Sequence, residues 1–144
     1  MRRFLTYVLA CALVSAVVSA EKAKTADDLQ KAMKKIGPTQ QAVNKAIQAM
    51  AYADAKKQLA TMKADIVDAE GFWVVKKKDD AVKFSHGTVA KIDALDKLLD
   101  AKPADQAAIT TAYREVGAAC SSCHRVYRAT DENNQFVIKP GTVS

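Results

Sequence analysis

Two cysteines and a histidine stand together near the C-terminus, in the sequence Cys120-Ser121-Ser122-Cys123-His124. Two thiols three positions apart, followed at once by an imidazole, have the spacing of covalent c-type haem attachment. Each thiol can add across one haem vinyl group to give a thioether, and the histidine can then ligate the iron. The motif therefore predicts one haem c bound covalently through Cys120 and Cys123, with His124 on its iron.

The same residues could serve other chemistry. A thioredoxin-like redox pair lies at a helix start after a strand, and no strand pattern precedes Cys120. A structural zinc site needs four ligands, and the cysteines and histidines available after cleavage of a signal would be the motif's own three plus His86. A chance occurrence on an apolar face is the remaining alternative. Haem attachment is favoured because the chain carries an export signal and has no further cysteine once that signal is removed.

Residues 1–20 have the organisation of a cleavable secretory signal peptide. Two arginines are followed by an apolar run and then by small residues ahead of Glu21. Cleavage there would leave residues 21–144 as a monohaem domain in the periplasm, with no stable membrane insertion. It would also remove Cys11, so that no disulfide framework can form.

Composition limits the fold and the class of partner. Loss of the two leading arginines lowers the formal net charge from +6 to +4, and the basic residues are spread along the chain. No nucleic-acid surface is therefore predicted. Few Gly and Pro residues, 5 and 3 in the chain, and 6% aromatic residues favour helices in a single domain. No acid–base pair is evident in the sequence, so an enzyme is not predicted.

Apolar residues recur at helical spacing in four segments. The first begins at a loose capping box at 25–28 and carries its stripe to Met50, with a kink or short break expected at Pro38. The second is expected to span 52–69 and to end at Gly71.

The third helix is expected to start at Asp79. The fourth carries Cys120 and Cys123 on its apolar face, so both thiols should point toward the core. Residues 130–144 have no helical period and are predicted to form an irregular tail. Four helices with short connections predict an all-α, antiparallel up-down four-helix bundle with its haem on the last helix.

An exported chain with one haem motif in the last of four helices resembles the class II c-type cytochromes, the cytochrome c′ family. The local match runs from Cys120 to Arg128 and fits that family's CxxCHxxYR pattern. The resemblance implies thioether bonds at both cysteines and His124 as the proximal ligand. Tyr127 is expected to pack near the haem edge, and Arg128 to lie close to the haem on the proximal side.

In this family the residue on the distal side of the iron comes from the first helix. Residues 30–35 are similar to the matching segment of low-spin members, in which a methionine ligates the iron. Met33 lies on the inward stripe between Leu29 and Ile36, and a thioether suits haem iron. The alternative is that Met33 only fills core space. Met50 and Met62 are expected to be core residues, and His86 to be a surface histidine.

The two states of Met33 imply two functions. Ligation by His124 and Met33 implies a low-spin periplasmic carrier of single electrons, which meets other redox proteins transiently. A five-coordinate iron implies instead a high-spin protein that binds NO or CO. Family members occur as monomers and as homodimers formed by the first two helices.

Overall fold

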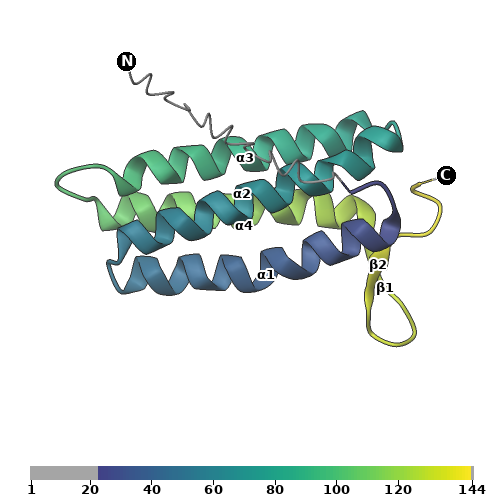
Figure 1. Ribbon diagram of the computed structural model, residues 1–144, viewed down its shortest axis with the longest axis horizontal. Helices are drawn as coiled ribbons and strands as arrows, with labels where there is room; N and C mark the ends of the chain where they lie inside the picture. The colour runs from purple at the N-terminus through teal and green to yellow at the C-terminus, as the bar shows by residue number, and fades with distance from the viewer. Residues whose placement is uncertain (1–22, 144) are drawn as a thin grey trace, which may run out of the picture.

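The computed structural model describes residues 23–143, so the signal peptide expected at residues 1–20 lies outside the described residues. Four helices run alongside one another (Figure 1): α1 (Ala26–Gln48), α2 (Tyr52–Val75), α3 (Asp79–Leu99) and α4 (Gln106–Tyr127). Short connections make consecutive helices antiparallel. The predicted all-α four-helix bundle is confirmed. Among the helices in this part of the chain, none has the length and apolar character needed to cross a membrane.

The helices that carry the candidate ligands have defined starts. At α1, the Thr25 hydroxyl accepts the Asp28 amide at 3.2 Å, and the Asp28 carboxylate accepts the Thr25 amide at 3.1 Å. At α4, the Asp105 carboxylate accepts the Ala108 amide at 3.0 Å. These bonds satisfy amides that have no partner within the helix. The capping box expected at 25–28 is therefore present.

The helix α1 is continuous where a kink or a short break was expected. It runs through Pro38 without interruption. Proline removes one helical donor, but the buried residues Ile36 and Val43 lie on either side of it and hold both halves against the same core. The Thr39 hydroxyl also donates to the Lys35 carbonyl at 2.9 Å. Packing therefore keeps the helix intact across the proline.

The end of α2 also differs from the prediction. Gly71 lies inside the helix, which continues to Val75. Glycine costs a helix about 1 kcal/mol relative to alanine. Phe72 and Trp73 are 1% and 4% exposed, and burial of an aromatic side chain contributes more than that cost. Tertiary packing thus extends the helix beyond its local stop signal.

The buried side chains fall into two groups along the bundle. The larger group, here called the bundle core, includes Val43, Leu59, Met62, Ile92, Leu95 and Val116. The group at one end, here called the end cluster, includes Leu29, Ala32, Phe72, Trp73 and Tyr127. Met33 is partly buried and packs against both groups. Cys120 packs against the bundle core and Cys123 against the end cluster. The CSSCH motif and Met33 therefore lie where the two groups meet.

The four helices are unevenly packed. The helix α1 packs mainly on α2, and α3 packs on both α2 and α4, whereas α1 and α4 touch at few points. The bundle thus has an open seam between its first and last helices. These are the two helices that carry Met33 and the CSSCH motif.

Two methionines outside this seam have different environments. Met62 is fully buried, as expected. Met50 was expected in the core but is 68% exposed, so that prediction is wrong. The helix α1 ends at Gln48, and Met50 lies in the following turn with a φ of 55°. The reversal of the chain turns its side chain away from the stripe.

The C-terminal segment is not the irregular tail that was expected. Strand β1 (Arg128–Thr130) follows α4 directly and pairs antiparallel with β2 (Phe136–Ile138). In this register Arg128 lies opposite Ile138, and Thr130 lies opposite Phe136. Residues 128–138 are called the C-terminal hairpin below. Figure 1 shows it beside the first turns of α1.

Loss of the α1 cap gives a testable stability change. Thr25→Ala removes a hydroxyl that satisfies an otherwise unpaired amide and should lower the free energy of unfolding by about 1 kcal/mol. Denaturant titration of the haem-loaded protein measures it. Thr61→Ala is the matched control, because Thr61 is an exposed helix-interior threonine whose hydroxyl donates to Lys57. Equal stability of the two variants would contradict the capping role.

Candidate functional site

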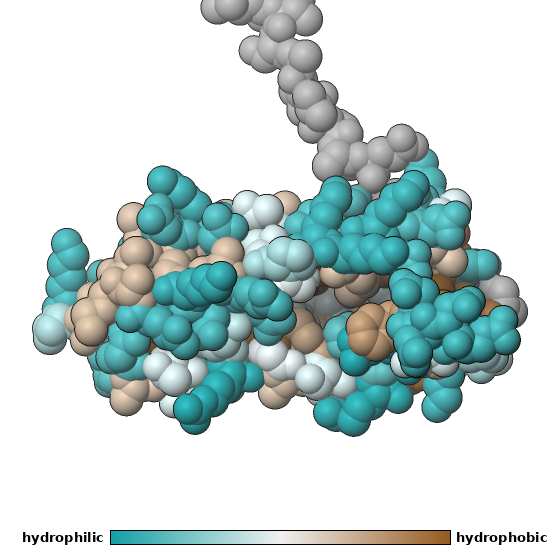
Figure 2. All heavy atoms as spheres, turned by 90° about the horizontal axis from the view of Figure 1, so that it is seen from below, coloured by the Kyte–Doolittle hydropathy of each residue, from teal (hydrophilic) through white to brown (hydrophobic). Residues whose placement is uncertain are grey.

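The open seam contains a cavity of about 810 Å³. Its walls come from all four helices and the C-terminal hairpin. The volume lies within the range of roughly 300–1,000 Å³ that is common for ligand and cofactor sites. Figure 2 shows hydrophobic side chains in a hollow on this face, surrounded by hydrophilic ones. All the residues assigned to the cofactor from the sequence line the cavity: Met33, Cys120, Cys123, His124, Tyr127 and Arg128.

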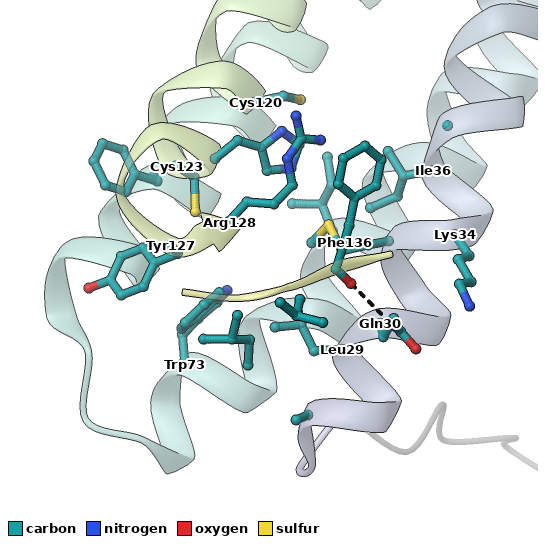
Figure 3. A pocket seen from close by; sticks show the side chains of 18 of the residues that line it. Leu29, Gln30, Lys34, Ile36, Trp73, Cys120, Cys123, Tyr127, Arg128 and Phe136 are labelled. Atoms are coloured by element: carbon teal, nitrogen blue, oxygen red, sulfur yellow. Dashed lines mark hydrogen bonds between the residues drawn. The ribbon is translucent and has the colours of Figure 1, made fainter. Parts of the chain in front are cut away.

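The helix α4 supplies one continuous wall. Cys120, Cys123, His124 and Tyr127 are spaced by three, one and three residues, and such positions share one face of an α-helix. Both cysteines are free thiols and partly buried. Figure 3 shows their side chains on the side of α4 that faces the cavity, with α1 across from them. The helix period therefore brings two thiols and one imidazole to the same surface.

The protonation of the thiols argues against a redox pair. Burial raises the pKa of Cys120, and burial together with the nearby Cys120 and Asp80 raises the pKa of Cys123 to about 11. Reactive redox cysteines have a lowered pKa, because the thiolate is the nucleophile. Both thiols are therefore protonated near neutral pH. They are suited to addition across a vinyl group rather than to disulfide exchange.

The imidazole of His124 is held in its neutral form. Burial lowers its pKa, and the neighbouring charge of Arg128 lowers it further. A metal-ligating histidine must be neutral, since the lone pair of one ring nitrogen binds the metal. His124 is therefore in the state required of an axial ligand.

Tyr127 anchors the end of α4. Its hydroxyl donates to the Asp80 carboxylate at 2.7 Å, and its ring lies 4.6 Å from the Trp73 ring. The Trp73 ring in turn meets Phe72 edge-on at 4.9 Å. Burial and the Asp80 carboxylate raise the pKa of Tyr127 to about 12. These contacts join α4 to the end of α2 and the start of α3, and so build the floor of the cavity.

The opposite wall comes from α1. Leu29, Met33 and Ile36 line the cavity from successive turns of this helix, and Met33 is partly buried there. Figure 3 shows Leu29 and Ile36 on α1, facing the space in front of α4. Met33 and His124 thus belong to helices on opposite sides of one cavity. This is the relation that two axial ligands of one iron require.

The third wall was missed by sequence reasoning. Phe136, Val137 and Ile138 line the cavity from β2. The guanidinium of Arg128 lies 4.2 Å above the centre of the Phe136 ring. A three-residue apolar run was the only signal in the sequence, and it did not show where the segment would lie. Asp80 was also missed, because its partner Tyr127 is 47 residues away.

The zinc alternative fails on geometry. Within residues 23–143, no group of three or more histidine, cysteine or acidic side chains is arranged to hold a metal ion. His86 lies on the surface, as expected, with its imidazole 66% exposed and 3.1 Å from Glu70. His86 is therefore not placed to act as a fourth ligand beside the CSSCH motif.

The Tyr127–Asp80 bond predicts a pH-dependent stability. The bond from Tyr127 lowers the pKa of Asp80 below its ordinary value of 3.8. The ionised carboxylate therefore contributes stability above that value, and the contribution is lost as pH falls through the folded-state pKa. Tyr127→Phe should be less stable than wild type at neutral pH, and the difference should shrink below about pH 4.

Urea unfolding of the haem-loaded protein between about pH 7 and pH 3 measures this change. Tyr113→Phe is the matched control, because the Tyr113 hydroxyl donates to the neutral Gln40 carbonyl at 3.1 Å. Its effect should not vary over that range. A Tyr127→Phe difference that is constant with pH would contradict the role of the Asp80 charge.

Comparison with known proteins agrees with this site. The family model described as Cytochrome C' matches residues 73–128, which include α3, α4 and the CSSCH motif and end before β2. Cytochrome c-556 of Agrobacterium tumefaciens (strain II Chrys) is 50% identical over 40 residues, covering 27% of this chain and 33% of that protein. The chain thus matches about a third of that relative's length. No solved structure matches it.

Three observations agree on one family. The family model covers the helix that bears the cysteines, the curated relative is a cytochrome by name, and the fold is a four-helix bundle. The CxxCHxxYR pattern from Cys120 to Arg128 lies within the matched residues. Together these observations support a class II c-type cytochrome.

Proposed function

We propose that this chain is a class II c-type cytochrome and a periplasmic electron carrier that holds one haem c through Cys120 and Cys123, with His124 and Met33 as axial ligands. One observation carries the proposal. The two thiols and the imidazole on α4 and the thioether on α1 line the same cavity from opposite sides. Covalent attachment requires the two thiols on α4, and six-coordinate iron requires ligands from both α4 and α1.

The residues present fit a haem. The cavity has the volume of a cofactor site, and apolar side chains such as Leu29, Ile36 and Trp73 line it. Its two thiols are protonated and its imidazole is neutral, as thioether formation and iron ligation require. These features support a covalently held c-type haem in the cavity.

A bound haem supplies one-electron chemistry at its iron. The chain's own residues would set the coordination and the reduction potential of that iron. His124 and Met33, held on separate helices, would keep the coordination similar in both redox states, and methionine ligation would raise the reduction potential. The apolar walls exclude water and act in the same direction. Such a site favours electron transfer over catalysis.

The cavity lining also supports a carrier rather than an enzyme. Among the lining residues in the described part of the chain, Asp27 is the single carboxylate, so no pair of carboxylates faces the site. The partners would be other redox proteins met through a small, transient interface, with this chain a monomer or a homodimer. Export to the periplasm follows from the signal peptide expected at residues 1–20.

A second function is favoured by a different observation. Met33 packs against both the bundle core and the end cluster, which is the behaviour of a side chain that fills space. If packing is its whole role, the iron would be five-coordinate and high-spin. The protein would then bind NO or CO at the open position.

Replacement of Met33 separates the two functions. Met33→Leu conserves volume but removes the thioether, so a ligated methionine predicts loss of the sulfur-to-iron absorption band in the oxidised protein. The reduction potential should fall by on the order of 0.1 V, within the ~0.8 V range that axial ligands control. Absorption spectra and a redox titration measure these changes.

The control is Met50→Leu, which changes an exposed methionine outside the cavity and should leave the spectrum unchanged. A wild-type spectrum that is already high-spin, and that Met33→Leu does not alter, would favour the gas-binding function and refute the carrier.

Covalent attachment is tested separately. Single Cys120→Ala and Cys123→Ala variants should each keep one thioether, with reduced haem incorporation. The double variant should keep none. Haem staining after denaturing electrophoresis and intact mass measure the outcome. Staining of the double variant at wild-type intensity would contradict attachment through these thiols.

A further inference from the structure

The C-terminal hairpin has a specified turn rather than a loose end. The Asp131 carboxylate accepts the Asn133 amide at 2.9 Å and the Gln135 amide at 2.8 Å. The Asp131 amide donates to the Gln135 carbonyl at 3.0 Å. Asn134 takes a φ of 57°, a conformation that asparagine adopts more readily than most residues. The local sequence thus reverses the chain at a fixed point and returns it toward the bundle.

Contacts on several sides hold the returning strand. The Lys139 amide donates to the Tyr127 carbonyl at 2.7 Å, which ties the end of β2 to the end of α4. Ile138 packs against the end cluster. The Gln30 side-chain amide donates to the Phe136 carbonyl at 3.0 Å, which ties β2 to α1. The strand therefore spans from the helix that bears CSSCH to the helix that bears Met33.

Phe136 is unusual among the residues of this strand. It lines the cavity, yet its side chain is 58% exposed and its ring contacts the guanidinium of Arg128. Figure 3 shows Phe136 and Arg128 in the opening between α4 and α1, with the bond from Gln30 at the base of the Phe136 residue. A large apolar ring gains little from such a position in the polypeptide alone. A flat apolar ligand in the cavity would give it a surface to cover.

We propose that the C-terminal hairpin is the closing wall of the haem site, with Phe136 limiting the entry of water and small ligands and Gln30 anchoring the strand. The inference rests on the proposed haem in the cavity. It does not depend on whether Met33 ligates the iron. Phe136 is thus a specificity-determining residue, which acts by covering the site rather than by touching the iron.

Ligand entry into holoprotein that carries Met33→Leu tests the wall, because entry there does not wait for a methionine to leave the iron. Phe136→Ala should raise the association rate constants of CO with the reduced protein and of imidazole with the oxidised protein. We expect an increase of about tenfold or more, since a factor of ten needs only a small drop in barrier. Stopped-flow absorbance measures both rates. Val75→Ala is the control, because Val75 is 54% exposed and lies outside the cavity lining.

Gln30, which anchors β2 to α1, gives a second test of the wall. Gln30→Leu keeps a side chain of similar size but removes the bond to the Phe136 carbonyl. Ligand entry should rise by a few-fold, and backbone amides of residues 128–138 should exchange hydrogen faster. Phe136→Leu should fall between the Met33→Leu parent and Phe136→Ala, because it keeps apolar cover of smaller area.

Three results would decide against the wall. Entry rates in Phe136→Ala equal to those of the Met33→Leu parent and of Val75→Ala in the same parent would overturn it. If Phe136→Ala does not mature, unchanged rates in Phe136→Leu would overturn it equally. Exchange of the β2 amides in wild-type holoprotein as fast as in the residues after Lys139 would also overturn it. Absence of covalent haem in the wild type would instead refute the proposed function, so the two failures are distinguishable.

Discussion

The open seam between α1 and α4 is the constraint on which the rest of this structure depends. A four-helix bundle normally fills the space between all neighbouring helices with side chains, because voids forfeit packing energy. Here α1 and α4 touch at few points, and a cavity of about 810 Å³ lies between them. Such a fold lacks part of its core until a ligand supplies it. Binding of a haem to the native state alone would therefore stabilise the bundle as well as equip it for electron transfer.

The walls of the seam are rigid because each is packed from behind. The helix α1 rests on α2, and α4 rests on α3. At the floor, Tyr127 is fixed by its bond to Asp80 and its contact with Trp73, so the last turn of α4 cannot shift without breaking both. Rigid walls would keep a bound iron in similar coordination in both redox states, as the proposed electron transfer requires. The same rigidity would suit a protein that admits only small gases.

The C-terminal hairpin adds a wall that the helices cannot provide. The bundle leaves one side of the seam open, and β2 crosses that side from α4 to α1. Its main-chain groups are satisfied by β1 and by Gln30, so the crossing leaves few polar groups unpaired. A site built in this way can differ from its relatives in access to the haem without any change in the helices.

Local features were predictable from the sequence because they depend on neighbouring residues. The capping box at Thr25 and the common face of Cys120 and Cys123 are examples, and both are present. The expected helix end at Gly71 was wrong, and of the kink or short break expected at Pro38 the break is absent, because burial of side chains on both sides outweighs a local signal. Met50 was misassigned because α1 ends before it, and the turn that follows points its side chain away from the apolar face of the helix.

The sequence by itself predicted the attachment chemistry and determined the helical period that gathers its residues and the class of bundle. Only the tertiary structure decided what faces the CSSCH motif. The bond from Gln30 to Phe136 joins residues 106 positions apart, and that from Tyr127 to Asp80 joins residues 47 apart. No local pattern encodes such pairs, since they exist only when separate helices pack. The seam, its floor and its closing wall are therefore properties of the packed chain.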